Sequence, residues 1–365
     1  MNLIIDRRDL VESLKSVVGP TTTKQDFLAL SSVLITTEKN QIKFITTDLN
    51  LTITTQTKGD IKTPGKALVP MRRFISIARE LPDTKINLEK VKNNLLIKCE
   101  KVEFKINTLK EEEFPRIQEK KEAVTIKMLP EALEEMVRLT SFCAGYEDVN
   151  YVLSGVLFEI KGNKIKLVAT DGKRLSCAAR DFPDNQAEIE EKIAFILPNK
   201  TVGEIARITK EKQNPFYLSF SKKNIEFDFK ETKIIARPIE GDFPNYSQYI
   251  PKQKGNQLTV DKNDFTASLR RIGLLTTAEY QGVKFSLKKN KMIVYKTTPQ
   301  LGEAKEEINT KYQGPALEIE FNPNYFIDIL KQIKDQEITI DFFGTEKPAV
   351  IKRENHTYLL LPMKT

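Results

Sequence analysis

The chain has 365 residues, of which 40% are hydrophobic and 30% are charged. This balance is typical of a folded, water-soluble protein of two or three domains, and it argues against intrinsic disorder. Lysine and arginine (58) exceed aspartate and glutamate (50), and the net charge of +8 suits an anionic polymer as partner. The N-terminus reaches its first charge at Asp6, and no apolar run approaches the roughly 18 residues of a spanning helix, so we expect a cytoplasmic protein.

The same order of predicted elements recurs three times along the chain: a helix, alternating strands and a second helix. In each helix, apolar residues return at a spacing of three and four, which indicates an amphipathic helix with one buried face. A proline stands near the start of the second helix of each copy, where its missing N–H group costs nothing. The predicted elements of the three copies cover residues 6–17, 32–57 and 67–83, then 129–142, 155–179 and 195–211, then 261–274, 282–298 and 318–335.

Two matching linkers separate the copies. Segments 111–123 and 240–257 both place Phe-Pro after an acidic residue and continue with polar residues, as exposed connections do. The sequence therefore predicts an α+β protein with three repeated domains, each with two helices packed on antiparallel sheets. The predicted domains are 1–122, 123–254 and 255–365.

Cations recur at equivalent places in the predicted helices. Five residues past the first buried anchor of each helix, the early helices have Lys15, Arg138 and Arg270, and the later helices have Arg79, Arg207 and Lys331. An α-helix has 3.6 residues per turn. A side chain five residues past a buried anchor therefore points away from the core. These cations either lie on ordinary solvated helix faces or form a repeated positive surface that binds phosphates. The chain has no recognition-helix, zinc or RNP-type pattern, so any nucleic-acid contact is expected to ignore base sequence.

Few groups suited to catalysis are present. His356 is the only histidine and is expected in a surface turn, and Cys99, Cys143 and Cys177 lie far apart. No Ser-His-Asp, Cys-His or zinc arrangement can be assembled from them, and glycine-rich phosphate loops are absent. We expect idle thiols, no enzyme activity and no cofactor or metal.

Asp48 and Asp171 are the carboxylates that invite a catalytic interpretation. Both follow a strand at the same place in successive copies, in "TTDLN" and in "ATDGK". A carboxylate that caps a tight turn by accepting backbone N–H groups explains this equivalence, and we expect that role. The alternative is a metal-dependent nuclease or phosphoesterase that uses both aspartates with nearby acids.

The segments "ATDGKRL", "EGDFPNY", "FNPNYFIDIL" and "YLLLPMK", in this order and spacing, resemble the bacterial DNA polymerase III beta subunit family, the DNA sliding clamps. The resemblance covers the whole chain. It implies a polymerase processivity factor in which two subunits join head to tail into a ring around double-stranded DNA, with helices lining the hole. It also implies that the replicative polymerase, the clamp loader and repair proteins dock through short peptides. A monomeric peptide-binding adaptor is the remaining alternative.

The resemblance also implies site residues. The peptide pocket would comprise Leu153, Thr170, Gly172, Lys173, Arg174, Leu175, Pro244, Tyr249, Asn322, Tyr325, Leu361, Pro362, Met363 and Lys364. Further DNA contacts would come from Lys24, Arg72, Arg73, Asn150, Tyr151 and Lys200. At the dimer interface, Phe104 and Ile106 would face Leu274 and Leu275, and Arg73, Lys98 and Lys105 would face Glu303, Glu306 and Glu307. The family pattern is altered at Lys173, Gln248, Lys364 and Thr365 in the pocket and at Val152 beside Tyr151.

Overall fold

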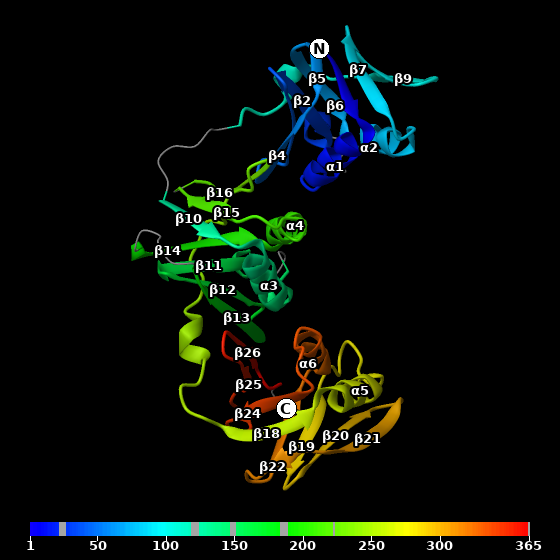
Figure 1. The fold of residues 1–365 in the computed structure, drawn as a ribbon. Helices are drawn as coiled ribbons and strands as arrows, with labels where there is room; N and C mark the ends of the chain where they lie inside the picture. The colour runs from blue at the N-terminus through cyan, green and yellow to red at the C-terminus, as the bar shows by residue number, and fades with distance from the viewer. Residues whose placement is uncertain (22–26, 118–123, 147–150, 183–188, 222, 364–365) are drawn as a thin grey trace. The chain divides into compact units, whose positions relative to one another are not determined.

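The computed structural model describes residues 1–21, 27–117, 124–146, 151–182, 189–221 and 223–363 (Figure 1). The described residues pack into two compact units, one with residues 1–131 and 204–238 and the other with residues 132–203 and 239–363. The predicted middle domain contributes to both units, so the domain boundaries at residues 122 and 254 stay a prediction. None of the described helices combines the length and apolar character that crossing a bilayer requires.

Six α-helices form in the described residues, one for each predicted helix. Each buries one apolar stripe, as Leu10 and Leu14 do in the first of them. Proline stands at the start as expected: Pro70 is the N-cap of the second helix and Pro323 is the first residue of the sixth. The helices are α1 (Arg7–Val17), α2 (Met71–Glu80), α3 (Pro130–Thr140), α4 (Asn199–Thr209), α5 (Lys262–Gly273) and α6 (Pro323–Leu330).

The first unit contains two antiparallel sheets. One has five strands in the order β5 (Asp60–Thr63), β1 (Asn2–Asp6), β7 (Lys85–Val91), β8 (Asn94–Cys99) and β9 (Val102–Asn107). The other has eight strands in the order β10 (Val124–Met128), β15 (Phe216–Phe220), β16 (Ile225–Asp228), β17 (Thr232–Ala236), β4 (Leu51–Lys58), β3 (Gln41–Thr47), β2 (Ser32–Glu38) and β6 (Gly65–Pro70).

The second unit also contains two antiparallel sheets. Nine strands follow the order β14 (Ile189–Pro198), β11 (Gly155–Gly162), β12 (Lys164–Thr170), β13 (Arg174–Asp181), β26 (His356–Leu360), β25 (Ala349–Lys352), β24 (Glu337–Phe342), β18 (Asn256–Asp261) and β22 (Lys311–Tyr312). Four strands follow the order β21 (Gly302–Asn309), β20 (Lys291–Thr298), β19 (Val283–Lys288) and β23 (Leu317–Phe321).

Each large sheet joins strands from two successive copies of the repeat. In the first unit β4 pairs with β17, and Thr52 lies opposite Ile235. In the second unit β13 pairs with β26, and Leu175 lies opposite Leu359. Because main-chain hydrogen bonds run through both joints, the ends of these strands are held in register, and the candidate site described below lies at the second joint.

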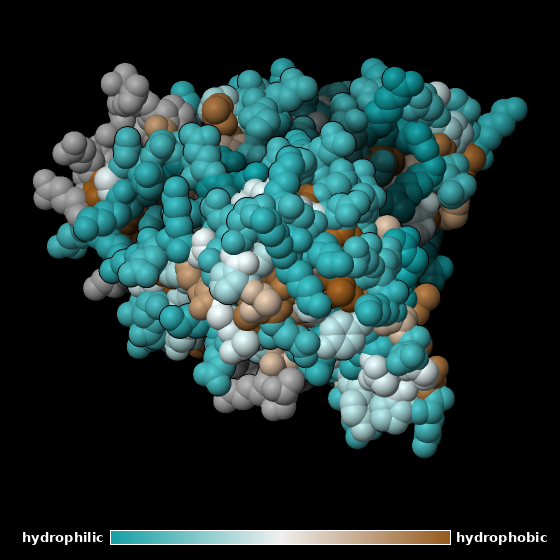
Figure 2. Space-filling model, turned by 90° about the horizontal axis from the view of Figure 1, so that it is seen from below, coloured by the Kyte–Doolittle hydropathy of each residue, from teal (hydrophilic) through white to brown (hydrophobic). Residues whose placement is uncertain are grey.

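Turn and core chemistry explain these elements. The hairpins β2–β3, β11–β12 and β19–β20 turn at Lys39, Gly162 and Asn290, which adopt positive φ angles of 53°, 59° and 60°. In the second unit the ring of Phe326 lies 5.3 to 5.6 Å from three other phenylalanine rings of the α5–α6 core. Such aromatic clusters supply much of the buried apolar area. Hydrophilic residues cover most of the face in Figure 2.

The prediction that His356 lies in a surface turn was wrong. His356 is the first residue of β26 and pairs with Ala178 of β13, and its half-buried ring contacts the ring of Tyr358 at 5.2 Å between centroids. Burial, assisted by the nearby Arg180 and Arg353 guanidinium groups, lowers the pKa of His356 below its ordinary value of 6.5. The imidazole is therefore neutral in the folded protein at neutral pH.

Acidification should destabilise the fold through His356. Above about pH 6.5 the His356 ring is neutral in the folded and in the unfolded state. Below about pH 6.5 the ring binds a proton in the unfolded state but stays neutral in the folded state. The free energy of unfolding should therefore fall between about pH 7.5 and about pH 5.5 on account of this one group. Urea unfolding of the wild type and of His356→Gln at both pH values measures this contribution. An identical pH dependence in the two proteins would contradict it.

Candidate functional site

The turn between β12 and β13 is held by two side chains that cap its backbone. Asp171 Oδ1 accepts hydrogen bonds from the backbone N–H groups of Lys173 and Arg174, both at 2.9 Å. The Gly172 N–H group donates to Thr170 Oγ1 at 3.1 Å, and Gly172 has a φ of 84°, which glycine adopts without a steric penalty. The predicted turn-capping role of Asp171 is confirmed.

The turn between β3 and β4 repeats these bonds. Asp48 Oδ1 accepts the backbone N–H groups of Asn50 at 3.0 Å and Leu51 at 2.7 Å, and the Leu49 N–H group donates to Thr47 Oγ1 at 3.1 Å. The turn-capping role predicted for Asp48 is likewise confirmed. Each aspartate thus has a structural role in its own turn, which accounts for their equivalence without a shared catalytic site.

Arg174 connects this turn to two other parts of the second unit. Its guanidinium donates to Asp171 Oδ2 at 3.1 Å, to Asp328 Oδ2 on α6 at 2.8 Å and to the Phe142 carbonyl at 3.0 Å. It also lies over the ring of Tyr325, with its carbon 4.7 Å from the ring centroid. Burial alone would raise the pKa of Asp328, but the hydrogen bonds from Arg174 and Lys331 outweigh it and lower that pKa. The Arg174 guanidinium and the Asp328 carboxylate therefore both stay charged.

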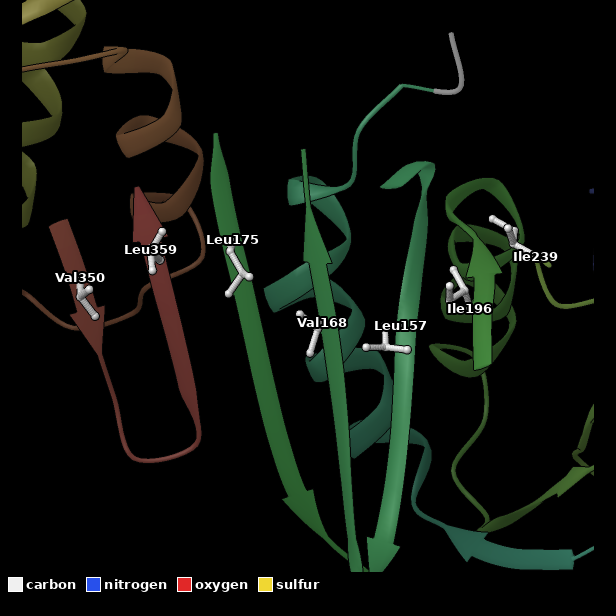
Figure 3. Packing of buried hydrophobic residues seen from close by; sticks show 7 residues of the cluster. All are labelled: Leu157, Val168, Leu175, Ile196, Ile239, Val350 and Leu359. Carbon is white, nitrogen blue, oxygen red and sulfur yellow. The ribbon is translucent and has the colours of Figure 1, made fainter. Parts of the chain in front are cut away.

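Next to the turn, apolar side chains from strands of the nine-stranded sheet, together with Ile239 beside β14, form a wall (Figure 3). Leu175 was the member predicted from the sequence; Val350 and Leu359, on the neighbouring strands β25 and β26, were missed. The continuous apolar run "YLLL" was the available signal for Leu359, because such a run is consistent with a strand that is buried on both faces. The buried members are Leu157, Val168, Leu175, Ile196, Ile239, Val350 and Leu359. Linker residues Phe243, Tyr246 and Ile250 pack against them.

Apolar residues after β26 remain accessible beside this wall. Leu361 and Met363 are each 37% exposed. Their backbones are fixed, since the Leu361 N–H group donates to the Lys173 carbonyl at 2.9 Å and the Met363 N–H group donates to the Glu320 carbonyl at 2.8 Å. The other predicted pocket residues with accessible surface are Leu153, Gly172, Lys173, Pro244, Tyr249 and Pro362. We call these residues, with the Arg174 turn and Leu175, the β13–β26 site.

Two further predicted pocket residues have clear structural roles. Asn322 is the N-cap of α6, and its Oδ1 accepts the Asn324 N–H group at 3.0 Å. Its Nδ2 group donates to Gln281 Oε1 at 3.4 Å. Tyr325 supplies the ring beneath Arg174. Both residues position the start of α6 against the β13–β26 site. Lys364 lies outside the described residues.

Most residues predicted to contact DNA are accessible, although Lys331 is paired with Asp328 at 3.0 Å. Lys24 and Asn150 lie outside the described residues. The exposed members of the predicted set are Lys15, Arg72, Arg73, Arg79, Tyr151, Lys200, Arg270 and Lys331.

Arg138 and Arg207 differ from the other repeated cations, because both are half-buried and bind the ends of other helices. Arg207 Nη2 donates to the Ser16 carbonyl in the last turn of α1 at 3.1 Å. Arg138 Nη1 donates to the Gln332 carbonyl, just past α6, at 3.0 Å. Carbonyls at a helix C-terminus lack helical partners and attract cations. These two arginines therefore connect helices of successive repeats, a role that the alignment of charges did not reveal.

Two of the segments predicted for the dimer interface are edge strands of the described sheets. β9, which carries Phe104 and Ile106, is the last strand of the five-stranded sheet, and β21 is the last strand of the four-stranded sheet. Leu274, just after α5, is 81% exposed. Three of the predicted interface charges already have partners in their own sheet or unit, in the pairs Lys98–Glu103, Arg271–Glu306 and Lys291–Glu307. Glu303 and Lys105 are exposed, and Leu275 is half-buried.

The described residues contain no group of three or more His, Cys, Asp or Glu side chains placed to hold a metal ion. Cys99, Cys143 and Cys177 are free thiols. Burial raises the pKa of Cys143, and it raises the pKa of Cys177 to about 11. These two thiols are protonated at neutral pH and are poor nucleophiles.

Replacing Arg174 with glutamine should leave Asp171 and Asp328 without their cation. Removing one partner of a half-buried, hydrogen-bonded charge cluster should lower the free energy of unfolding by about 2–4 kcal/mol. The neighbouring Lys173 is exposed, so Lys173→Gln serves as the matched control with an expected change of about 0.5 kcal/mol or less. Urea unfolding measures both. Equal midpoints for the two variants would contradict the central role of Arg174.

Three protein-family models, one for each domain of the DNA polymerase III beta subunit, match the chain in the order of the domains. The N-terminal domain matches residues 1–118, the central domain 127–245 and the C-terminal domain 247–364. A beta sliding clamp of Chlamydia muridarum is 28% identical over 100% of this chain and 99% of its own length. The solved DNA polymerase III subunit beta of Pseudomonas aeruginosa has a TM-score of 0.95 with 26% identity, and a griselimycin-bound sliding clamp of Bartonella birtlesii has a TM-score of 0.95 with 25% identity, each covering 100% of both chains. The chain therefore belongs to the DNA polymerase III beta subunit family.

Proposed function

We propose that this protein is a processivity factor for DNA polymerase, a sliding clamp without catalytic activity of its own. The observation that carries this proposal is the match of all three beta subunit domains, in order, over nearly the whole chain. Two copies would join head to tail into a ring that encircles double-stranded DNA. The ring would act in the cytoplasm, where the bacterial chromosome is replicated, and a separate ATP-driven loader would open it.

Sequence-independent contact with DNA fits the cations that are exposed. Lys15, Arg79 and Arg270 recur at equivalent helix positions, and Arg72 and Arg73 lie exposed at the start of α2. Side chains of this kind bind phosphates electrostatically and carry no base information. Because a closed ring is held by topology, weak contacts of this kind allow it to slide. Arg138 and Arg207 would contribute less, since their guanidinium groups are engaged with helix ends.

The β13–β26 site fits the docking of short peptides from the replicative polymerase, the clamp loader and repair proteins. Leu361 and Met363 offer accessible apolar surface on a backbone that is fixed by hydrogen bonds. Methionine adapts its shape to different partners, which suits a site shared by several proteins. Peptide affinities near the micromolar range, about −8 kcal/mol, would allow these partners to exchange.

The dimer interface is proposed at the free edges of β9 and β21. Each edge presents unpaired backbone groups that another strand can satisfy. Phe104, Ile106, Leu274 and Leu275 would provide the apolar contact, which should outweigh exposed ion pairs worth about 0–1 kcal/mol each. Glu306 and Glu307 would have to share or exchange their present partners to pair with the other subunit.

Retention on circular DNA tests the ring. The protein is loaded onto a nicked circular plasmid by the cognate clamp loader with ATP and is then separated from free protein by gel filtration. We expect it to co-elute with the circle and to be released when a restriction enzyme linearises the plasmid, because a ring slides off free ends. A linear plasmid blocked at both ends by bound protein is the control and should retain it. Equal retention on open linear and circular DNA would favour the monomeric adaptor.

The double substitution Leu274→Ala with Leu275→Ala tests the interface. It removes apolar contact area from the proposed dimer, so sedimentation should show the mass shifting from two chains to one. Leu129, an exposed leucine just before α3 that the proposal does not place at the interface, provides the control Leu129→Ala, which should remain dimeric. A double variant that still sediments as two chains would show that the interface lies elsewhere.

A further inference from the structure

The first unit contains a cavity of about 180 Å³ at the joint between β4 and β17. Its wall combines apolar side chains with two arginines. Its lining includes Leu49, Thr52, Arg116, Ile117, Ile235 and Arg237. We call this the β4–β17 cavity.

The β4–β17 cavity occupies the place in the first unit that the β13–β26 site occupies in the second. In both, a turn capped by an aspartate leads into the central strand of the joint. In both, the residue that follows the partner strand adds one more backbone hydrogen bond. After β17, the Arg237 N–H group donates to the Asn50 carbonyl at 2.8 Å. After β26, the Leu361 N–H group donates to the Lys173 carbonyl at 2.9 Å. The same backbone frame is therefore built twice.

The side chains on this frame differ in charge. Arg237 stands at the position equivalent to Leu361, and Arg116 follows the linker Phe-Pro where Asn245 follows it in the second linker. Both arginines are exposed. Arg116 and Arg237 together give the β4–β17 cavity a cationic rim, whereas Leu361 and Met363 give the β13–β26 site an apolar one.

Leu49 provides an independent observation. It takes a φ of 76°, at the position where the second unit has Gly172 with a φ of 84°. A left-handed conformation is unfavourable for leucine and free of steric cost for glycine. Leu49 is nonetheless 54% exposed and lies in the cavity wall. Its large side chain is thus held at the surface at a conformational cost, a pattern found at functional sites.

We propose that the β4–β17 cavity is a second peptide-docking site, which takes an extended acidic segment of a partner protein. Carboxylates of the segment pair with Arg116 and Arg237, and one aliphatic side chain packs among Leu49, Ile117 and Ile235. A cavity of this volume holds about one such side chain, whereas a DNA backbone has no apolar group to fill it. The proposal depends on the repeated backbone frame and not on ring formation.

Fluorescence anisotropy tests this with the labelled peptide acetyl-Asp-Leu-Asp-Leu-Asp-amide at fixed ionic strength. We expect saturable binding that weakens by about tenfold or more in the double variant Arg116→Gln with Arg237→Gln, because two charge-assisted hydrogen bonds are lost. The same peptide with asparagine in place of aspartate should not bind. Arg8→Gln, which removes an exposed arginine of α1 outside the cavity, should leave the affinity unchanged.

Two further variants distinguish this site from the alternatives. Leu49→Gly should weaken the binding of the peptide. It should not lower the thermal unfolding midpoint, because glycine adopts the left-handed conformation without the steric cost that leucine has there. If the role of Leu49 is purely structural, the affinity should not change. Leu361→Ala, in the β13–β26 site, should have no effect on this peptide. The proposal is overturned if the peptide binds the double arginine variant as well as the wild type, if Leu361→Ala abolishes binding, or if a duplex oligonucleotide displaces the peptide in the wild type but not in the double variant.

Discussion

Main-chain hydrogen bonding between strands of successive repeats is the constraint on which the rest of this structure depends. The β4–β17 and β13–β26 pairings carry each large sheet across a predicted domain boundary. Each such bond contributes only about 0.5–1.5 kcal/mol, but a ladder of them fixes register, and a shift by one residue would turn every side chain to the opposite face. The apolar wall around Leu175 exists because residues from both repeats meet on one face.

Charge is arranged in support of that joint. The Asp171 turn places Arg174 so that one guanidinium reaches a neighbouring carbonyl, a carboxylate on α6 and an aromatic ring. Since guanidinium has five N–H donors in a fixed plane, it can satisfy several acceptors at once where lysine could not. The accessible leucine and methionine beyond β26 then lie beside a rigid framework. Binding a peptide there would require little ordering of the protein, which favours affinity.

Much of this could be predicted from local sequence, and the exceptions have a common physical origin. Helices and turn caps follow from spacing and turn chemistry within a few residues, and they were predicted correctly. His356 was misplaced because its strand is defined by pairing with Ala178, far away in the chain. Arg138 and Arg207 were grouped with the exposed cations because their acceptors are 194 and 191 residues distant. Val350 was missed for the same reason, because it joins the cluster of Leu175 only through the pairing of β25 with β26 and of β26 with β13.

The engagement of Arg138 and Arg207 with helix carbonyls affects how charge-scanning experiments on this protein are interpreted. Neutralising Lys15 or Arg79 changes the electrostatic potential and little else, since both are exposed. Neutralising Arg207 also leaves the Ser16 carbonyl without its donor. A loss of salt-dependent affinity for DNA in such a variant would thus have two causes, the missing charge and the weakened connection between helices. Citrulline, which keeps guanidine-like donors without the charge, would separate them.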